Sequence, residues 1–245
     1  MKTDHQERFV YSLLDETYAA QAIACLCRVF SAQEPLGKAL GISPDELAPF
    51  VADLVHHAIK INLSWVAIEK ASSRLAGVRI LTDFHNDFIP GDYTSQKLNT
   101  IFTFLDSLYQ AQPHGEDNEY NPLLHCWMVA VLPAFQRQGV LRNLYRSGSF
   151  WAYKKGFRWG VEEVTSRYNL AFLESEVTVT KLNTLNYAQY ESGGTLPFLL
   201  VEDSKACVLC RYPLEIESGC YTALLRWRVG NPVFPVPLTG GERAR

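Results

Sequence analysis

The sequence lacks the long apolar runs that membrane proteins require. None of its stretches approaches the roughly 18 consecutive apolar residues of a membrane span. Residues 1–8 are polar, and no apolar segment of the kind found in secretory signals follows them. We therefore expect a cytoplasmic protein with no membrane partner.

An excess of positive charge is also missing. The 245 residues include 23 lysines and arginines against 26 aspartates and glutamates, so the formal net charge is −3. Proteins that bind nucleic acid usually present a basic surface, which neutralises phosphate groups. The composition therefore predicts that nucleic acid is not a partner.

Six cysteines are present, but they lack the dense, regular spacing of a small disulfide-rich domain. Cys207 and Cys210 have the spacing of half a zinc site, and no second cysteine or histidine pair completes that site. Val208 and Leu209 between them indicate a buried strand instead. We expect reduced thiols and no metal.

The sequence shows no sign of a boundary between domains. No proline-rich, glycine-rich or single-sign charged linker divides the chain, and 47% of its residues are hydrophobic, which is enough for one large core. We predict a single domain over residues 1–245, with its motifs within about 9–215 and a C-terminal strand and tail over 216–245.

Hydrophobic periodicity predicts alternating strands and helices. Asp15 is the expected cap of the first helix, and Ser43 with Glu46 has the pattern of a capping box for the second. Helical spacing covers about 15–30, 44–58, 95–110, 141–155 and 168–176. Strand patterns cover 9–14, 65–69, 76–81, 127–131, 161–165, 181–187, 206–212 and 221–227. This order predicts an α/β protein with a mixed sheet flanked by helices.

The most informative segment is 127–141, where an apolar strand, a short polar loop and a helix start follow one another. The backbone N–H groups of such a loop converge at the helix N-terminus, where they offer hydrogen bonds and partial positive charge to a diphosphate. Gly139 lets the backbone approach that ligand closely. Ordinary strand–loop–helix connections share this pattern, so the rest of the sequence has to show whether the segment is a phosphate-binding loop.

The order Val-x-Val-x-Pro-x-x-Gln-x-x-Gly in this segment resembles the acetyl-CoA signature of the GCN5-related N-acetyltransferase superfamily. Gln136, Gly139 and Leu141 occupy its three marked places, and Leu141 stands where glycine or alanine is usual, which narrows the groove or tilts the helix. The resemblance implies splayed central strands that form a V-shaped cleft for acetyl-CoA. It also implies that the cofactor is bound by Val129, Ala130, Val131, Gln136, Arg137, Gln138, Gly139, Val140, Leu141 and Arg142.

Other segments resemble the arylalkylamine, or dopamine-type, branch of that superfamily. The resemblance covers roughly residues 9–212, and the segments occur in the order that the branch uses. They are Glu34-Pro35-Leu36, Leu63-Ser64-Trp65-Val66-Ala67, Ala76-Gly77-Val78, Val164-Thr165-Ser166-Arg167-Tyr168-Asn169 and Leu185-Asn186-Tyr187-Ala188-Gln189-Tyr190.

Chemistry and resemblance together nominate four candidate catalytic residues. A primary amine is mostly protonated at neutral pH, so a base must accept its proton before it attacks a thioester. Glu34 matches the branch's glutamate and is the candidate base, although charged loop residues are usually solvated. Thr165 and Asn169 match two serines of the branch, and Asn169 cannot relay a proton as a hydroxyl does. Tyr190 is a candidate acid in a segment whose composition favours a strand.

We therefore expect direct acetyl transfer from acetyl-CoA to a small aryl- or alkylamine, by a monomer or homodimer. Two alternatives stay open. A degenerate protein that binds acyl-CoA without turnover is favoured by Leu141 and Asn169, and transfer to a protein or peptide amine requires an open groove. His125, in the strand before the signature, either lines the cleft or is a satisfied core histidine, and the second interpretation is favoured.

Overall fold

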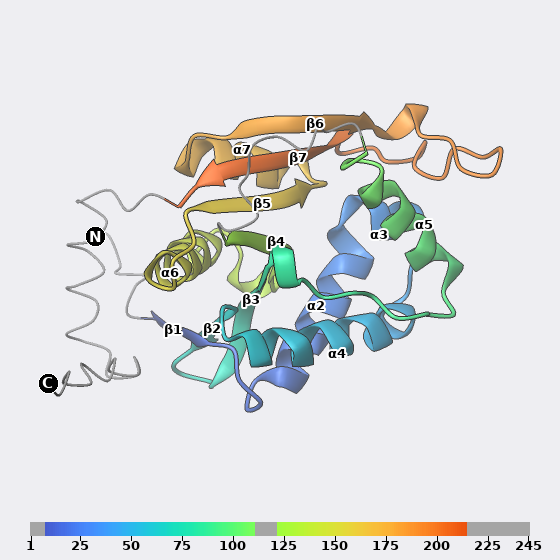
Figure 1. Cartoon of the computed structure of the whole chain (residues 1–245). Coiled ribbons are helices and arrows are strands. Elements are labelled where there is room, and N and C mark those ends of the chain that lie inside the picture. The colour runs from blue at the N-terminus through green and yellow to red at the C-terminus, as the bar shows by residue number, and fades with distance from the viewer. Residues whose placement is uncertain (1–7, 111–121, 215–245) are drawn as a thin grey trace, which may run out of the picture. The chain divides into compact units, whose positions relative to one another are not determined.

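The computed structural model describes residues 8–110 and 122–214, which form a seven-stranded sheet with helices on both faces (Figure 1). The strands are β1 Phe9–Leu13, β2 Trp65–Glu69, β3 Arg74–Asp83, β4 Leu123–Val131, β5 Trp159–Val164, β6 Thr180–Asn186 and β7 Ala206–Pro213. The helices are α2 Ala19–Gln33, α3 Pro35–Ala39, α4 Pro44–Ile61, α5 Gln96–Asp106, α6 Val140–Lys154 and α7 Arg167–Glu176, with short 3₁₀ helices η1 Phe84–Asn86, η2 Pro133–Phe135 and η3 Tyr187–Gln189. The strand predicted over 221–227 lies outside the described residues.

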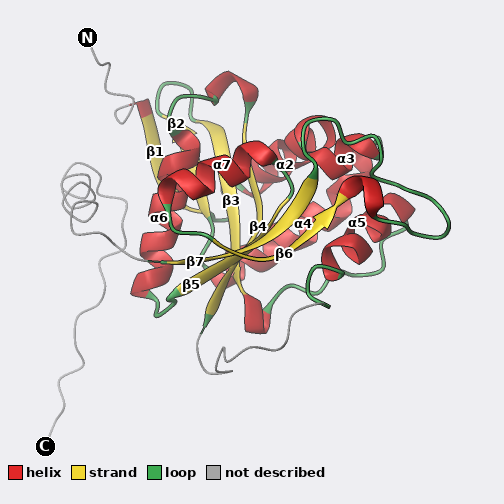
Figure 2. Ribbon diagram, turned by 90° about the horizontal axis from the view of Figure 1, so that it is seen from above, coloured by secondary structure: helices red, strands yellow, loops and turns green. Residues whose placement is uncertain are grey.

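The sheet confirms the predicted mixed topology. Its strand order is β1-β2-β3-β4-β5-β7-β6, and every neighbouring pair is antiparallel except β4 and β5. This one parallel contact joins two antiparallel halves. In Figure 2, β5, β6 and β7 run obliquely across the direction of β1 to β3.

Helices α2 to α5 cover one face of the sheet, and α6 and α7 cover the other. On the first face, Leu26 of α2 and Leu54 of α4 are buried against Ile80 of β3. On the second face, Leu173 of α7 is buried with Val164 of β5. Full burial of one such side chain contributes about 1.5–3 kcal/mol, so these two layers hold the strands in place.

The helix starts show where local signals were sufficient. Ser43 accepts from the Glu46 N–H at 3.2 Å and Glu46 accepts from the Ser43 N–H at 2.9 Å, which confirms the predicted capping box of α4. The predicted cap at Asp15 is wrong. Its carboxylate instead accepts from the Thr17 N–H at 2.9 Å, closing a turn that delays the helix start to Ala19. Among the described residues, no helix is long and apolar enough to cross a membrane.

Candidate functional site

The parallel strands β4 and β5 separate soon after they meet. Their register holds three residue pairs, the last of which joins His125 to Val161. Past this pair β4 continues to Val131 and β5 to Val164, without further pairing between the two strands in the described chain. The separation corresponds to the splayed strands expected from the sequence.

A β-bulge marks the start of this separation. Ile80 pairs with Met128 and Leu81 pairs with Cys126, so Trp127 is an extra residue in β4. The bulge changes which residues face which layer: Cys126 packs on the α6 and α7 side, whereas Met128 packs on the α2 and α4 side. Such bulges re-aim side chains and are frequent beside functional sites.

The predicted phosphate loop runs from η2 to the start of α6. Gly139 precedes the helix with φ 79°, in the left-handed region that glycine adopts without strain, and Arg137 also has a positive φ of 59°. No side chain caps α6, and its first turn contains no acidic residue. The first N–H groups of a helix have no partner within the helix, so this terminus offers donors to an anion.

Two glutamine side chains hold the loop. The Gln136 amide nitrogen donates to the Val131 carbonyl at 3.1 Å and to the Gln33 side-chain oxygen at 3.0 Å. The Gln138 amide nitrogen donates to the Ala134 carbonyl at 2.9 Å. Gln136 therefore connects the loop to Gln33, the last residue of α2.

The other predicted cofactor residues differ in what they expose. Val140 is buried, so only its backbone is available, and Leu141 is half-buried against the core between α6 and α7. Arg142 forms an ion pair with Glu176 of α7 at 2.8 Å, while Arg137 is exposed. Past the bulge, Val129, Ala130 and Val131 lie on the diverging part of β4. Their roles stay predictions.

Glu34 lies between α2 and α3 and is partly buried. Its two carboxylate oxygens accept from the N–H groups of Leu36 at 3.1 Å and Gly37 at 2.7 Å, so the side chain caps α3. Burial raises the pKa of the Glu34 carboxyl, although these two N–H groups and the Thr165 side chain oppose the shift. A carboxylate with a raised pKa is better suited to accept a proton near neutral pH.

The structure brings Thr165 to Glu34. The Thr165 side chain lies near enough to the Glu34 carboxylate to lower its pKa, and the Thr165 carbonyl accepts from the Tyr187 hydroxyl at 2.7 Å. Tyr187 is buried, which anchors the end of β5 against the start of η3. Two of the four candidate catalytic residues thus lie together, although their sequence positions differ by more than a hundred residues.

Asn169 and Tyr190 lie in other surroundings. The Asn169 amide nitrogen is 3.4 Å from a Glu162 carboxylate oxygen and 3.5 Å from the Tyr145 hydroxyl, on the α6 and α7 face. Tyr190 follows η3, where its ring packs edge-on against Phe104. The predicted strand, β6, ends at Asn186, so the strand expected for Tyr190 is wrong: a 3₁₀ helix intervenes and Tyr190 follows it. Neither contact set includes Glu34, so the catalytic roles of Asn169 and Tyr190 stay predictions without geometric support.

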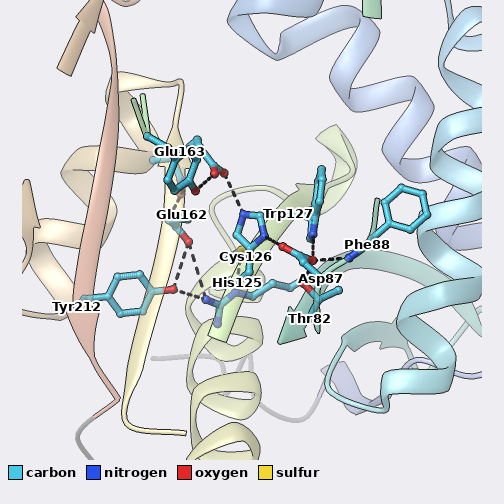
Figure 3. A network of polar contacts seen from close by, with 12 residues as sticks. Thr82, Asp87, Phe88, His125, Cys126, Trp127, Glu162, Glu163 and Tyr212 are labelled. Carbon is cyan, nitrogen blue, oxygen red and sulfur yellow. Dashed lines mark hydrogen bonds and ion pairs between the residues drawn. The ribbon is translucent and has the colours of Figure 1, made fainter. Parts of the chain in front are cut away.

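A buried polar network lies at the separation of β4 and β5 (Figure 3). The two ring nitrogens of His125 contact Asp87 and Glu163, the latter at 3.1 Å. Asp87 also accepts from Trp127 and from Thr82, each at 2.6 Å. The favoured interpretation of His125 as a satisfied core histidine agrees with these contacts.

The charges of this network stabilise one another. Burial lowers the pKa of His125, but the neighbouring Glu163 and Asp87 outweigh that effect and raise it to about 10. Burial likewise opposes ionisation of the two carboxyls, yet His125 brings the pKa values of Asp87 and Glu163 below their usual range. Near neutral pH the group is therefore one cation between two anions.

A second network surrounds Glu162 on the opposite face. Its carboxylate accepts from the Tyr145 hydroxyl at 3.0 Å and from the Tyr212 hydroxyl at 3.3 Å. The fully buried Arg79 donates to the Tyr212 hydroxyl at 2.8 Å and lies 3.9 Å from Glu162. Burial raises the pKa of Glu162, partly offset by the charge of Arg79.

Sequence reasoning missed both networks, although a signal was present. Arg79 interrupts the apolar pattern of β3, and Glu162 with Glu163 interrupts that of β5. Charged residues inside otherwise buried strands need partners, because an unpaired buried charge is costly. The partners themselves come from distant segments and cannot be read from the pattern.

The half zinc site suggested by Cys207 and Cys210 is not assembled. Both thiols are buried in β7, but Cys207 packs with the α3 and α5 side and Cys210 with the α6 and α7 side. Residues three apart on a strand face opposite ways, which explains this arrangement. Within the described residues, no three His, Cys, Asp or Glu side chains are arranged so that they could hold a metal ion.

Comparisons with solved structures identify the fold. Arylalkylamine N-acetyltransferase 2 from Aedes aegypti superposes with a TM-score of 0.73 at 17% identity, covering 84% of this chain and 99% of that one. The C-terminal condensation domain of Ebony, in complex with beta-alanyl-dopamine, gives 0.72 at 17% identity, with 84% and 99% covered. The chain has the GCN5-related N-acetyltransferase fold.

A further structure with this acetyltransferase fold is the Drosophila melanogaster polyamine N-acetyltransferase. Its TM-score is 0.65 at 16% identity, with 85% of this chain and 100% of that chain covered. No protein-family model matches the sequence, and no curated protein matches it either. At these identities the acetyltransferase fold is shared while the substrate is left open.

Proposed function

We propose that this chain transfers the acetyl group of acetyl-CoA to a small primary amine. The proposal is carried by the position of Glu34, a partly buried carboxylate beside the predicted cofactor loop. Gln136 of that loop donates to Gln33, the residue before Glu34, at 3.0 Å. This hydrogen bond joins the predicted phosphate loop to the residue next to the candidate base.

The start of α6 fits the anionic cofactor. Ser43 and Ser95 cap α4 and α5, whereas no side chain caps α6 after Gly139. Its free N–H groups and the helix dipole favour a phosphate group. The loop from Gln136 to Arg142 would hold the diphosphate, and the backbone of Val129 to Val131 would lie along the thioester arm. Bound acetyl-CoA supplies an activated acetyl group.

The ionisation of two glutamates separates their roles. Burial raises the pKa of Glu34, while the charge of His125 overcomes burial and lowers the pKa of Glu163. Carboxyl groups whose environments push their pKa values apart serve different functions. We assign proton acceptance from the amine to Glu34, because the lowered pKa of Glu163 makes it the weaker proton acceptor.

Thr165 supports Glu34 in this assignment. Its side chain lies near the carboxylate and opposes the upward shift of the Glu34 pKa. The hydroxyl can rotate between donating to the ionised carboxylate and accepting from the protonated acid. Thr165 thus orients the base in both of its protonation states.

A second candidate is amide formation from an acyl donor other than acetyl-CoA. It is favoured by the structural likeness to the condensation domain of Ebony, which holds beta-alanyl-dopamine. The half-buried Leu141, where the superfamily usually has a small residue, also agrees with a changed donor site. The two candidates share the amine and differ in acetyl-CoA affinity.

The test combines calorimetry with an amine panel read by release of free thiol from acetyl-CoA. Gly139→Asp places a carboxylate at the start of α6, and Gly139→Asn is its neutral match, since both residues tolerate a positive φ. We expect the wild type to bind acetyl-CoA, the aspartate variant to lose binding, and the asparagine variant to lose less. A folded aspartate variant with unchanged affinity would remove the loop from the proposal, and absence of wild-type binding would favour another donor.

A further inference from the structure

The contact between His125 and Glu163 spans the two strands where they begin to separate. His125 is the last β4 residue paired with β5, opposite Val161. Glu163 lies two residues farther along β5, so its side chain is on the same face as that of Val161. The 3.1 Å contact between the imidazole and Glu163 thus bridges the strands directly past their last backbone pair (Figure 3).

The other ring nitrogen of His125 connects to the bulge. It contacts Asp87, whose carboxylate also accepts from the indole N–H of Trp127 at 2.6 Å and from the Phe88 N–H at 2.7 Å. Trp127 is the extra residue of the β4 bulge. Asp87 therefore holds both the imidazole and the displaced part of β4.

Two carboxylate partners require both ring nitrogens of His125 to donate. Only the imidazolium carries two N–H groups, so the observed contacts fit the charged form. Other ionisable groups act on it through Glu163: the Tyr109 hydroxyl donates to that carboxylate, and Asp106 and Cys207 interact with its charge. In this state His125 has no lone pair with which to accept a proton from a substrate.

We propose that His125, as an imidazolium between Asp87 and Glu163, is a positioning residue that fixes the separation of β4 and β5 where acyl group and amine meet. This positioning role rests on the proposed function, because it presupposes that acetyl transfer takes place between the two strands. Loss of the proton leaves one carboxylate facing a ring lone pair, which weakens the side-chain bridge past the last backbone pair of the two strands. Misplacement of reacting groups by about 1 Å can cost a hundredfold in rate.

The first experiment compares His125→Gln with His56→Gln, a control on the exposed side of α4. We expect the His125 variant to lose at least tenfold in kcat while its acetyl-CoA affinity, set by the α6 loop, changes less than threefold. The control should match the wild type in both. A folded His125→Gln protein with wild-type kcat would overturn the proposal.

The pH profile separates positioning from a merely structural role. With an acceptor amine that is fully deprotonated below pH 8, we expect the wild-type rate to fall as pH approaches about 10, where His125 loses its proton. Glu163→Gln, which removes one anion from the imidazolium, should move this fall to lower pH. An unchanged alkaline limb in that variant contradicts the proposal.

Ring NMR of His125 in the intact wild-type protein tests the charge state without turnover or a foldable variant. We expect the imidazole to stay protonated up to about pH 10. Titration near 6.5, the ordinary histidine value, overturns the proposal. If wild type transfers no acetyl group while His125 remains protonated to high pH, the proposed function fails and the charged bridge between the strands stands.

Discussion

Glu162 and Glu163 are neighbours on β5, yet they enter buried networks that differ in the nature of the cation. Glu162 faces the α6 and α7 layer, where its cationic partner is Arg79. Glu163 faces the α2 to α5 layer, where its partner is His125. Arginine keeps its charge at any pH that a folded protein experiences, whereas histidine can lose its charge.

This difference shows that one strand can contact a network of fixed charge on one face and a network of pH-dependent charge on the other. The Arg79 guanidinium lies over the Tyr145 ring, 3.7 Å from its centroid, and donates to the Tyr212 hydroxyl, so the network on that face is held by a fixed charge. On the other face the charge depends on a proton held by His125. The site proposed for catalysis lies on the side whose charge can change.

The largest expected effect comes from breaking the fixed network. Arg79→Met leaves Glu162 buried without its cation, which for buried pairs costs about 3–5 kcal/mol in the free energy of unfolding. Urea unfolding measures the loss. The double variant Arg79→Met with Glu162→Met should recover much of it, because no charge is left unpaired. A loss below about 1 kcal/mol in the single variant contradicts the account.

The titratable network predicts a pH effect that the fixed one lacks. The pKa of His125 is raised from 6.5 to about 10 on folding, so its stabilising contribution is complete below pH 6.5 and is lost as pH rises towards 10. The slope is at most about 1.4 kcal/mol per pH unit. We compare the unfolding free energies of wild type and His125→Gln between pH 6.5 and 8, because above this range the thiols of the unfolded chain ionise near pH 9 while the buried thiols of the folded chain stay protonated.

In that window the wild-type curve should fall relative to the His125→Gln curve. The double variant Arg79→Met with Glu162→Met should fall in parallel with the wild type, because it leaves the imidazolium intact and also removes the Glu162 carboxyl, whose pKa would rise without Arg79. Parallel curves for wild type and His125→Gln would show that His125 is not charged in the folded chain.

The smallest expected effect on stability comes from an unsatisfied hydrogen-bond acceptor near Glu162. The Asn169 side-chain oxygen is buried without a partner in the described chain, and its amide nitrogen makes only long contacts of 3.4–3.5 Å. Asn169→Ser removes the unsatisfied acceptor, so we expect stability to rise by up to about 1 kcal/mol. Thermal unfolding gives the sign, and a loss of comparable size would mean that Asn169 is an essential part of the network.

The sequence was most informative where the signals were local. The capping box of Ser43 and Glu46 uses contacts within one helical turn, and the segment 127–141 uses a strand, a loop and a helix start in succession. Asp15 shows the limit of such signals, because its carboxylate can form either a helix cap or a tight turn. In the structure the tight turn forms, and the helix begins later, at Ala19.

The candidate site was predictable only in part, because its contacts join distant segments. The resemblance pointed to Glu34 and Thr165, and the structure places them near enough for Thr165 to lower the pKa of Glu34. No pattern indicated that Asp87 reaches His125, or that Trp127 is the extra residue of a bulge. Those features depend on strand register, which follows from the whole sheet rather than from any one segment.

The central claim is that Glu34 accepts the proton of an amine that attacks acetyl-CoA, and it is tested through Glu34→Gln. The glutamine keeps an oxygen that can accept from the Gly37 N–H, and Glu16→Gln on the exposed surface is the control. We predict that kcat for the best amine falls about a hundred- to ten-thousandfold while acetyl-CoA affinity stays level, as general-base catalysis implies. Equal turnover by the variant, the control and the wild type would contradict the claim.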